Sequence, residues 1–423
     1  MAGPGVHDVP GHRGTRSPGR TAKDGVESRY AWLRLTAALL LATIGGVGLW
    51  SVVVALPVVQ VEFGVARAGA SLPYTLTMVG FGVGGVVMGQ LADRLGALIP
   101  VVIGSVLLGL GYVVAAHAES MWPFAITYGL MIGVGSSVVF GPLVADISHW
   151  FDRRRGIAVA LCASGNYFAG AVWPPVLQHF IATVGWRETH IGIGIFCVAT
   201  MLPLAFVLRR QSPLAGSRPT ASSTSSAGLA LGLPPNVLQA LLIVAGVSCC
   251  VAMAMPQVHI VAYCVDLGYG AARGAEMLSV MLGCGVLSRL AFGLLMDRIG
   301  GLGTLLLGST LQAVALALFL PFDGLVSLYA LSAVFGLFQG GIVPSYAMIV
   351  RQFFPAQQAG ARIGLVLSST LAGMALGGWM SGAIFDATGS YQTALLNGIV
   401  WNLLNMSIAF WLLQRSWRRS VPA

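Results

Sequence analysis

One arginine, Arg289, lies inside a long apolar run near residues 273–296. A guanidinium in the middle of a membrane span costs about 2.5–3.5 kcal/mol on insertion scales, so it is expected to face a cavity or a partner. Gly285 and Gly293 lie four residues before and after it, and on a helix they would leave open space around its head. Because a guanidinium is a planar fork of donors that stays charged, Arg289 is a candidate to hold a carboxylate. The alternative is a structural arginine that pairs with an acid or a carbonyl oxygen.

Polar groups in the run near residues 156–182 could complete such an anion site. Asn166, Gly170 and Trp173 are spaced at i, i+4 and i+7, so on a helix an amide, a gap and an indole share one face. Together they could frame a small organic acid. Hydrogen bonding and packing between helices would produce the same pattern, so both interpretations stay open.

Two ionisable residues are candidates for moving a proton. His259 lies toward the outer end of the run near 237–264 and has a side chain that titrates near neutrality. Asp146 lies near the inner end of the run near 121–148. The alternatives are a packing role for His259 and a latch between Asp146 and the cations at 153–155. Without either residue, a proton could still leave together with the acid, or the solute could move by uniport or exchange.

The sequence patterns favour neither a cofactor nor a metal nor an enzyme. All six cysteines fall in apolar runs without metal-type spacing, so they are expected to be small core residues. There is no Gly-x-x-x-x-Gly-Lys phosphate loop, no HExxH pair and no candidate Ser/His/Asp set, which disfavours an ATP-driven pump or a membrane enzyme. A membrane receptor should carry an additional soluble domain, and no segment is long enough to form one.

The elements that must position these residues are helices in a lipid bilayer. Hydrophobic residues make up 56% of the 423 positions and charged residues 9%, and the mean hydropathy is +0.83. Soluble domains are about one quarter charged. The apolar stretches recur along the chain, and each could cross a hydrocarbon core of about 30 Å. Since they are continuous rather than alternating, they indicate an all-α integral membrane protein and not a barrel.

Charged clusters, prolines and glycines divide the chain into twelve expected spans. The first six lie near 34–60, 71–91, 98–116, 121–148, 156–182 and 188–208, and the second six near 237–264, 273–296, 302–320, 324–350, 362–385 and 391–414. The expected domains are a disordered tail at 1–33, an N-terminal half at 34–210, a linker at 211–235, a C-terminal half at 236–414 and a tail at 415–423.

The distribution of cations predicts the orientation. With the N-terminus inside, Arg67, Arg187 and Arg273 are the only cations in the expected outer loops, and the other cations outside the spans face the cytoplasm. By the positive-inside rule, both termini and the linker should be cytoplasmic, in the inner cell membrane. The net charge of +9 follows this distribution and is not gathered in a basic domain, so it does not predict nucleic-acid binding.

A sequence motif recurs at an offset of 204 residues. The segment GQLADRLG in the first half corresponds to GLLMDRIG in the second, and the same offset relates Gly64 to Gly268. The motif residues are Gly89, Asp93, Arg94 and Gly96 in the first copy and Gly293, Asp297, Arg298 and Gly300 in the second. Several matches at one offset imply two six-helix halves with the same orientation. The solute site should then lie between the halves near the midplane.

This doubled Gly-x-Leu-Ala-Asp-Arg-x-Gly loop resembles the signature loop of the major facilitator superfamily. The resemblance covers nearly the whole chain and implies twelve helices in two parallel-repeat halves and secondary transport by alternating access. We expect Asp93 and Asp297 to accept hydrogen bonds from helix-end N–H groups or to pair with cytoplasmic arginines, closing the inner side in one state. The alternative is a static ion pair in each loop.

A narrower resemblance is to the monocarboxylate transporter and oxalate–formate antiporter branches. It is carried by the segment WFDRRRGIA at 150–158, and by Arg289 followed by Gly293 and Asp297. It implies a small organic anion as substrate, similar to lactate, pyruvate or formate, carried by a functional monomer without a cofactor, with symport of protons as one mode.

The chain departs from these branches at the charged positions. Residue 285 is Gly where animal monocarboxylate transporters typically have Asp, and the first span has no Lys. Beyond Arg362, the span near 362–385 lacks the second cation expected of an oxalate exchanger. The alternative substrate is therefore a neutral or hydrophobic solute, as in drug efflux, with Arg289 structural.

Overall fold

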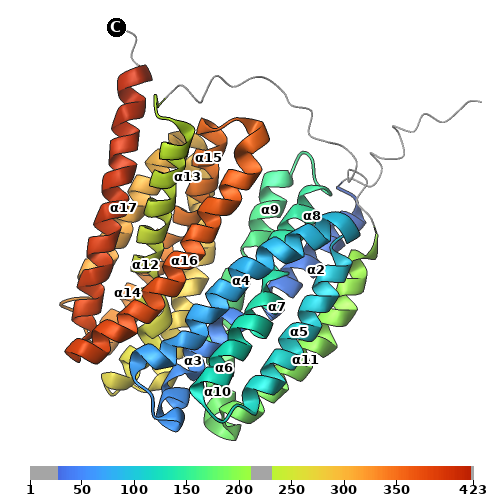
Figure 1. Ribbon diagram of the computed structural model, residues 1–423, viewed down its shortest axis with the longest axis vertical. Helices are drawn as coiled ribbons and strands as arrows, with labels where there is room; N and C mark the ends of the chain where they lie inside the picture. The colour runs from blue at the N-terminus through green and yellow to red at the C-terminus, as the bar shows by residue number, and fades with distance from the viewer. Residues whose placement is uncertain (1–26, 211–230, 421–423) are drawn as a thin grey trace, which may run out of the picture.

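The computed structural model describes residues 27–210 and 231–420, and every regular element in these ranges is a helix (Figure 1). The N-terminal half contains α2 (Arg29–Gly45), α3 (Val47–Phe63), α4 (Arg67–Leu95), α5 (Leu98–Ala116), α6 (Met121–Thr127), a π-helical turn (Tyr128–Gly133), α7 (Val134–Ser137), α8 (Gly141–Ser148), α9 (Arg155–Ala163), α10 (Gly165–Val184), α11 (Trp186–Phe206) and a 3₁₀ turn (Val207–Arg209). The C-terminal half contains α12 (Pro235–Asp266), α13 (Ala271–Leu318), α14 (Leu325–Gln339), α15 (Ile342–Phe353), α16 (Ala356–Thr388) and α17 (Tyr391–Ser420).

The described helices form eleven continuous stretches that are long and apolar enough to cross a membrane. One of them, α13, has 48 residues and would be about 72 Å long if it were straight. It bends back on itself at Gly300, whose backbone is not helical. The evidence for the bend is that a Cβ placed on Gly308 would lie only 3.5 Å from the ring of Phe292. A straight helix would separate those two residues by about 24 Å. The described residues therefore provide twelve crossings, and the expected all-α membrane fold is confirmed.

The glycine that ends each copy of the repeated motif has the same backbone conformation. Gly96 has φ 81° and ψ 170°, and Gly300 has φ 72° and ψ 173°. Side chains strongly disfavour this region, so glycine is the residue that allows the helix to reverse there. The repeat seen in the sequence is thus a repeat of the helix–turn–helix geometry.

The first and last helices extend past their expected ends. α2 begins at Arg29, so residues 29–33 of the expected tail are helical, and Ser28 caps the helix by accepting a 3.3 Å hydrogen bond from the N–H of Ala31. α17 continues to Ser420, past the expected end at 414. The apolar pattern underestimated both helices because their terminal turns are polar. Residues 1–26 of the expected tail and most of the linker, 211–230, lie outside the described residues.

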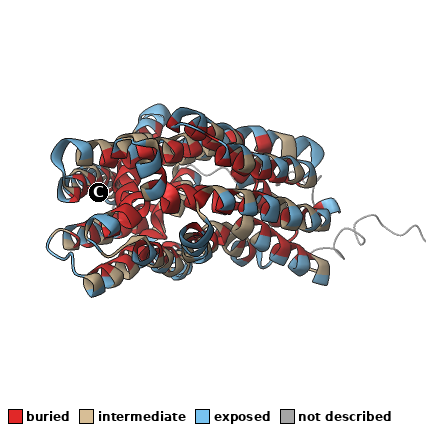
Figure 2. Ribbon diagram, turned by 90° about the horizontal axis from the view of Figure 1, so that it is seen from below, coloured by how far each residue is buried: buried red, intermediate tan, exposed pale blue. Residues whose placement is uncertain are grey.

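The most extensive contacts between the two halves are those of α4 with α16 and of α10 with α13, and α3 contacts α12 and α13 as well. In the first pair, Thr75 donates a 3.0 Å hydrogen bond to the carbonyl oxygen of Ala375. In the second pair, the hydroxyl of Ser279 donates to the carbonyl oxygen of Ala171. Figure 2 shows the buried residues gathered between the helices, with the exposed residues on the outer surface.

The contacts between the halves are concentrated at the end of the bundle where α4 begins, which we name the Arg67 end. In Figure 1, α4 and α16 lie close together there and diverge toward the opposite end, which we name the Asp93 end. The halves are therefore joined at the Arg67 end and separated at the Asp93 end.

Candidate functional site

Arg289 lies at the contact between the two halves and has no acidic partner among the described residues. Its Nη1 donates a 2.7 Å hydrogen bond to the carbonyl oxygen of Ala163, and its guanidinium carbon lies 4.5 Å from the centre of the Tyr167 ring. None of the ion pairs among the described residues includes Arg289. Its Nε is buried and receives no hydrogen-bond partner from the described residues. The site thus holds a half-buried positive charge that a carbonyl dipole and an aromatic ring compensate only in part.

The two glycines around Arg289 have different surroundings. A Cβ on Gly285 would lie 2.5 Å from two carbons of the Tyr167 ring, so the phenol fills the space that was expected to be open. A Cβ on Gly293 would meet no atom within 4 Å. Arg289 therefore stands at a boundary, with packed contacts on the side of the Arg67 end and open space on the side of the Asp93 end.

Asn166 and Trp173 are bound to the first span. The indole N–H of Trp50 donates to both the carbonyl oxygen and the Oδ1 of Asn166, at 3.2 and 3.3 Å. The indole N–H of Trp173 donates to the carbonyl oxygen of Thr43 at 2.8 Å. The structure thus directs the polar groups of both residues toward α2 and α3, and the residue of α10 that contacts Arg289 is Tyr167.

The spacing of polar residues in the sequence does not single out Tyr167. It follows Asn166 directly, so it lies about 100° farther around the helix than the face on which the expected site was built. The spacing of Gly285 and Arg289 on one face of α13 was the available signal, because a glycine next to an arginine leaves room for a large side chain from a facing helix.

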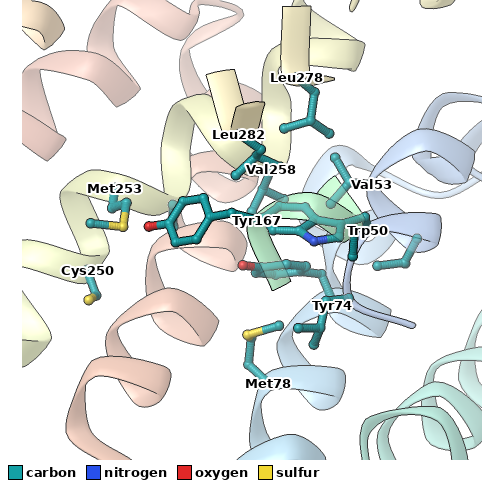
Figure 3. Close-up of a cluster of buried hydrophobic side chains, with 14 of the residues drawn as sticks. Trp50, Val53, Tyr74, Met78, Tyr167, Cys250, Met253, Val258, Leu278 and Leu282 are labelled. Carbon is teal, nitrogen blue, oxygen red and sulfur yellow. The ribbon is translucent and has the colours of Figure 1, made fainter. Parts of the chain in front are cut away.

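A cluster of buried side chains fills the space between the halves beside Tyr167 (Figure 3). Figure 3 shows the hydroxyls of Tyr74 and Tyr167 on the same side as the sulfur atoms of Met78, Cys250 and Met253. We name these five residues, with Trp50, Val53, Val258, Leu278 and Leu282, the central cluster. It joins α3, α4 and α10 of one half to α12 and α13 of the other. The packing is tight, since a Cβ on the nearby Gly170 would lie 2.2 Å from Leu282.

His259 belongs to a polar network at the Arg67 end. Its buried imidazole contacts the carbonyl oxygen of Gly378 through Nε2 at 2.8 Å and the hydroxyl of Tyr391 through Nδ1 at 3.2 Å. The same hydroxyl accepts a 2.9 Å hydrogen bond from Nη1 of Arg67. Arg67 also forms a 3.0 Å ion pair with Asp266. His259 of the C-terminal half is thus connected to Arg67 of the N-terminal half by two hydrogen bonds through the Tyr391 hydroxyl.

Asp146 forms a bidentate ion pair with Arg34 of α2. Both N···O distances are 2.7 Å, and Arg34 is only 1% exposed. Nη1 of Arg34 also donates a 2.9 Å hydrogen bond to the carbonyl oxygen of Arg210. The expected latch between Asp146 and the cations at 153–155 is therefore wrong. The buried guanidinium of Arg34 presents two parallel donors to the Asp146 carboxylate, and this bidentate geometry makes it a stronger partner than the exposed arginines at 153–155.

The repeated motif lies at the Asp93 end, with its charges exposed. Asp93, Arg94, Asp297 and Arg298 are all exposed, and no described cation lies within 4.0 Å of either carboxylate. This arrangement agrees with the separation of the halves at that end. The latch expected of Asp93 and Asp297 stays a prediction about a conformation closed at the Asp93 end.

Two surface pockets lie away from these residues. One, of about 510 Å³, is lined by His117, Glu119 and Pro123, and the other, of about 530 Å³, by Glu62, Phe63 and neighbouring residues. Neither includes Arg289, a residue of the central cluster or a residue of the motif. Both pockets are therefore separate from the residues around Arg289.

Comparisons with known proteins agree on one family. The family model of the Major Facilitator Superfamily matches residues 38–327 and 277–422. Monocarboxylate transporter 13 of Rattus norvegicus is 28% identical over 314 residues, which are 72% of this chain and 71% of that protein. An agnestins efflux protein of Paecilomyces divaricatus is 22% identical over 315 residues, 74% of this chain and 71% of that protein.

A solved structure has the same fold. The crystal structure of a bacterial homologue of the human lysosomal transporter Spinster, in an inward-facing and occupied conformation, superimposes with a TM-score of 0.72. The match covers 94% of this chain and 100% of that one, at 12% sequence identity. At that identity the likeness concerns the fold alone.

Proposed function

This chain belongs to the major facilitator superfamily, and from that membership and the surroundings of Arg289 we propose that it is a secondary active transporter of a small monocarboxylate. The solute moves by alternating access between the two halves. Arg289 holds the carboxylate, and Tyr167 holds the guanidinium in place. One observation carries the proposal: the cation lies between the halves without a described acid to neutralise it.

The chemistry of the guanidinium supports an anion of this kind. A carboxylate accepts two parallel hydrogen bonds from the planar fork and supplies the missing negative charge. The name of the rat relative, a monocarboxylate transporter, points to the same substrate class. At residue 285, where animal monocarboxylate transporters are expected to have an acid, this chain has glycine and the Tyr167 ring occupies the space.

Proton symport is part of the proposal, with His259 preferred over Asp146. Both carboxylate oxygens of Asp146 accept hydrogen bonds from Arg34, so this residue is held in an ion pair inside the N-terminal half. His259 contacts the network that joins the halves at the Arg67 end, so a change in its protonation would act on a contact between them. We also propose an inner-membrane location with both termini cytoplasmic, and a functional monomer.

A second candidate function is transport of a neutral or hydrophobic solute, as in efflux. It is favoured by the hydrogen bond from Arg289 to Ala163, which could be the whole role of the arginine, and by the apolar character of the central cluster. The relative named as an efflux protein points the same way.

Uptake into proteoliposomes separates the two candidates. Labelled lactate, pyruvate and formate are tested with and without a pH gradient, using the wild type, Arg289→Ala and Arg351→Ala. Arg351 is exposed, so its variant removes the same charge away from the site. We expect acid uptake that Arg289→Ala abolishes and Arg351→Ala leaves intact. Acid uptake by Arg289→Ala at the wild-type rate would reject the carboxylate site.

A further inference from the structure

We propose that the last turns of α17 bind the phosphate of an anionic phospholipid at the membrane surface of the Asp93 end. The site consists of Trp411, Arg415 and Arg418, which we name the α17 anchor. The occupant is a lipid of the surrounding bilayer and not a solute that the protein carries. The proposal is therefore independent of Arg289 and of the transported substrate.

The first argument is a continuous exposed face on α17. Val400, Leu404 and Trp411 are 65%, 43% and 42% exposed, and Figure 1 shows α17 running along the outside of the C-terminal half. At 100° per residue, these three residues and both arginines of the α17 anchor lie within about 60° of one another around the helix. An exposed apolar stripe on a peripheral helix of a membrane protein faces the lipid tails. The same face then becomes basic at Arg415 and Arg418.

The second argument is the depth at which the charges begin. The segment 391–414 contains no charged residue, and it starts at the Arg67 end, where the Tyr391 hydroxyl accepts a hydrogen bond from Arg67. From Tyr391 to Trp411 the helix rises about 30 Å, which is the thickness of the hydrocarbon core. Arg415 lies about 6 Å and Arg418 about 10 Å beyond Trp411, and each headgroup layer is about 5–8 Å thick. Both arginines are therefore at the depth of the lipid phosphates.

The third argument is that the α17 anchor holds positive charge without an acid. The guanidinium carbon of Arg415 lies 5.2 Å from the centre of the Trp411 ring, and its Nε and Nη2 donate to the carbonyl oxygens of Leu231 and Gly232 at 2.6 and 3.3 Å. None of the ion pairs among the described residues includes Arg415 or Arg418. Tryptophan and arginine are side chains that gather at this membrane depth. A phosphate supplies the missing negative charge and accepts hydrogen bonds from guanidinium groups.

The bonds from Arg415 give the site a structural consequence. Leu231 and Gly232 lead into α12, which begins at Pro235. The arginine that holds these two carbonyl oxygens also faces the headgroups, so a bound phosphate should fix its guanidinium in place. An anionic lipid should therefore stabilise the junction between α12 and α17. We expect this stabilisation to raise the melting temperature of the protein.

The test titrates purified full-length protein in neutral detergent with phosphatidylglycerol and follows its melting temperature. Phosphatidylcholine with the same acyl chains is the zwitterionic control, and glycerol 1-phosphate supplies the phosphate without the tails. We expect phosphatidylglycerol to raise the melting temperature and both controls to have little effect. Each arginine near an anionic surface strengthens binding about fivefold. Arg418→Gln should therefore weaken phosphatidylglycerol binding about fivefold, and the double variant Arg415→Gln/Arg418→Gln about 25-fold.

The choice of variants separates lipid binding from folding. Arg418 is exposed and forms no hydrogen bond with another described residue, so Arg418→Gln should leave the lipid-free melting temperature unchanged. Arg415→Gln removes the bonds to Leu231 and Gly232, so its effect is measured as the shift that lipid produces. The matched control is the double variant Arg298→Gln/Arg351→Gln. It removes two exposed arginines at the same end of the same half, and it should bind phosphatidylglycerol as the wild type does.

Three results would overturn the proposal. The first is equal stabilisation by phosphatidylglycerol and phosphatidylcholine, which would remove the preference for an anionic lipid. The second is wild-type affinity for phosphatidylglycerol in Arg415→Gln/Arg418→Gln, or an equal loss of affinity in the matched control. The third is stabilisation by glycerol 1-phosphate as strong as that by phosphatidylglycerol, which would assign the site to a soluble phosphate. None of these results bears on the carboxylate site.

Discussion

The carboxylate of Asp386, near the end of α16, accepts a 2.8 Å hydrogen bond from the backbone N–H of Arg67, the first residue of α4. Its second oxygen accepts another 2.8 Å bond from the N–H of Ala68. A C-terminal-half carboxylate thus caps a helix of the N-terminal half, where unpaired N–H groups and the helix dipole favour negative charge. This contact helps to hold the two halves together at the Arg67 end.

Asp386→Asn should therefore shift the protein toward a conformation open at the Arg67 end. Hydrogen bonds to a charged group are worth about 1.5–3 kcal/mol, so the ratio of the two conformations should change by about 10- to 150-fold. Distances between spin labels on α4 and α16 at that end would measure the shift. Asp323→Asn is the control, because Asp323 is exposed at the same end and forms no described ion pair. Identical distance distributions in Asp386→Asn and wild type would contradict the closing role.

Gly285→Ala should weaken acid binding although it adds a single methyl group. The new Cβ would lie 2.5 Å from the Tyr167 ring and would force the ring away from Arg289. Gly293→Ala is the matched control on the same helix, since its Cβ would meet no atom within 4 Å. Isothermal titration with the acid that binds best measures both variants. Unchanged affinity in Gly285→Ala would mean that Tyr167 does not position the guanidinium.

Arg289→Lys should reduce acid affinity by about 10- to 150-fold, because lysine keeps one charge but loses the planar fork. Arg289→Ala should reduce it further. The measurement is the rise in melting temperature that acid produces in purified wild type and in both variants. Equal rises in all three proteins would show that the arginine is structural. If Arg289 is structural, its replacement should instead lower the melting temperature of both variants in the absence of acid.

Asp93→Asn should slow transport and leave equilibrium binding of the acid largely intact. The carboxylate is exposed and has no described cation within 4.0 Å in this conformation, so we expect it to act when the Asp93 end closes. Turnover in proteoliposomes and the dissociation constant in detergent measure the two effects separately. Wild-type turnover in the variant would remove Asp93 from the gating mechanism.

Both termini and the segment between the halves should face the cytoplasm. A cysteine introduced by Thr220→Cys tests the segment that lies outside the described residues. A membrane-impermeant maleimide should not label it in intact cells and should label it after lysis. A cysteine in place of Glu119, at the Arg67 end, should be labelled in intact cells and serves as the control. Labelling of residue 220 before lysis would reverse the orientation.

The sequence predicts the fold well because the relevant signals are local. Runs of apolar residues show the spans, and motifs such as those ending at Gly96 and Gly300 show the repeat directly. The site is harder to predict because its contacts are distant. Arg34 and Asp146 are 112 residues apart, and Arg67 and Asp386 are 319 apart. With such separations, any of several cations could have been the partner of a given acid.

Arg289 could be singled out because a lone charge in an apolar run is conspicuous. Tyr167 could not, because a tyrosine in a membrane helix is ordinary until a facing glycine makes room for its ring. Asn166 and Trp173 showed a shared face, but helical spacing does not say which neighbour that face meets. The structure directs their polar groups to the first span.

The break between α9 and α10 leaves the carbonyl oxygen of Ala163 available to Arg289, which belongs to the other half. A rotation of the halves relative to each other must change this 2.7 Å bond and the number of donors that Arg289 offers to an anion. Under the proposed function, the two orientations then differ in intrinsic affinity. By linkage, the anion concentration sets the populations of the two orientations. Binding of the anion would therefore shift the conformational equilibrium before any transport takes place.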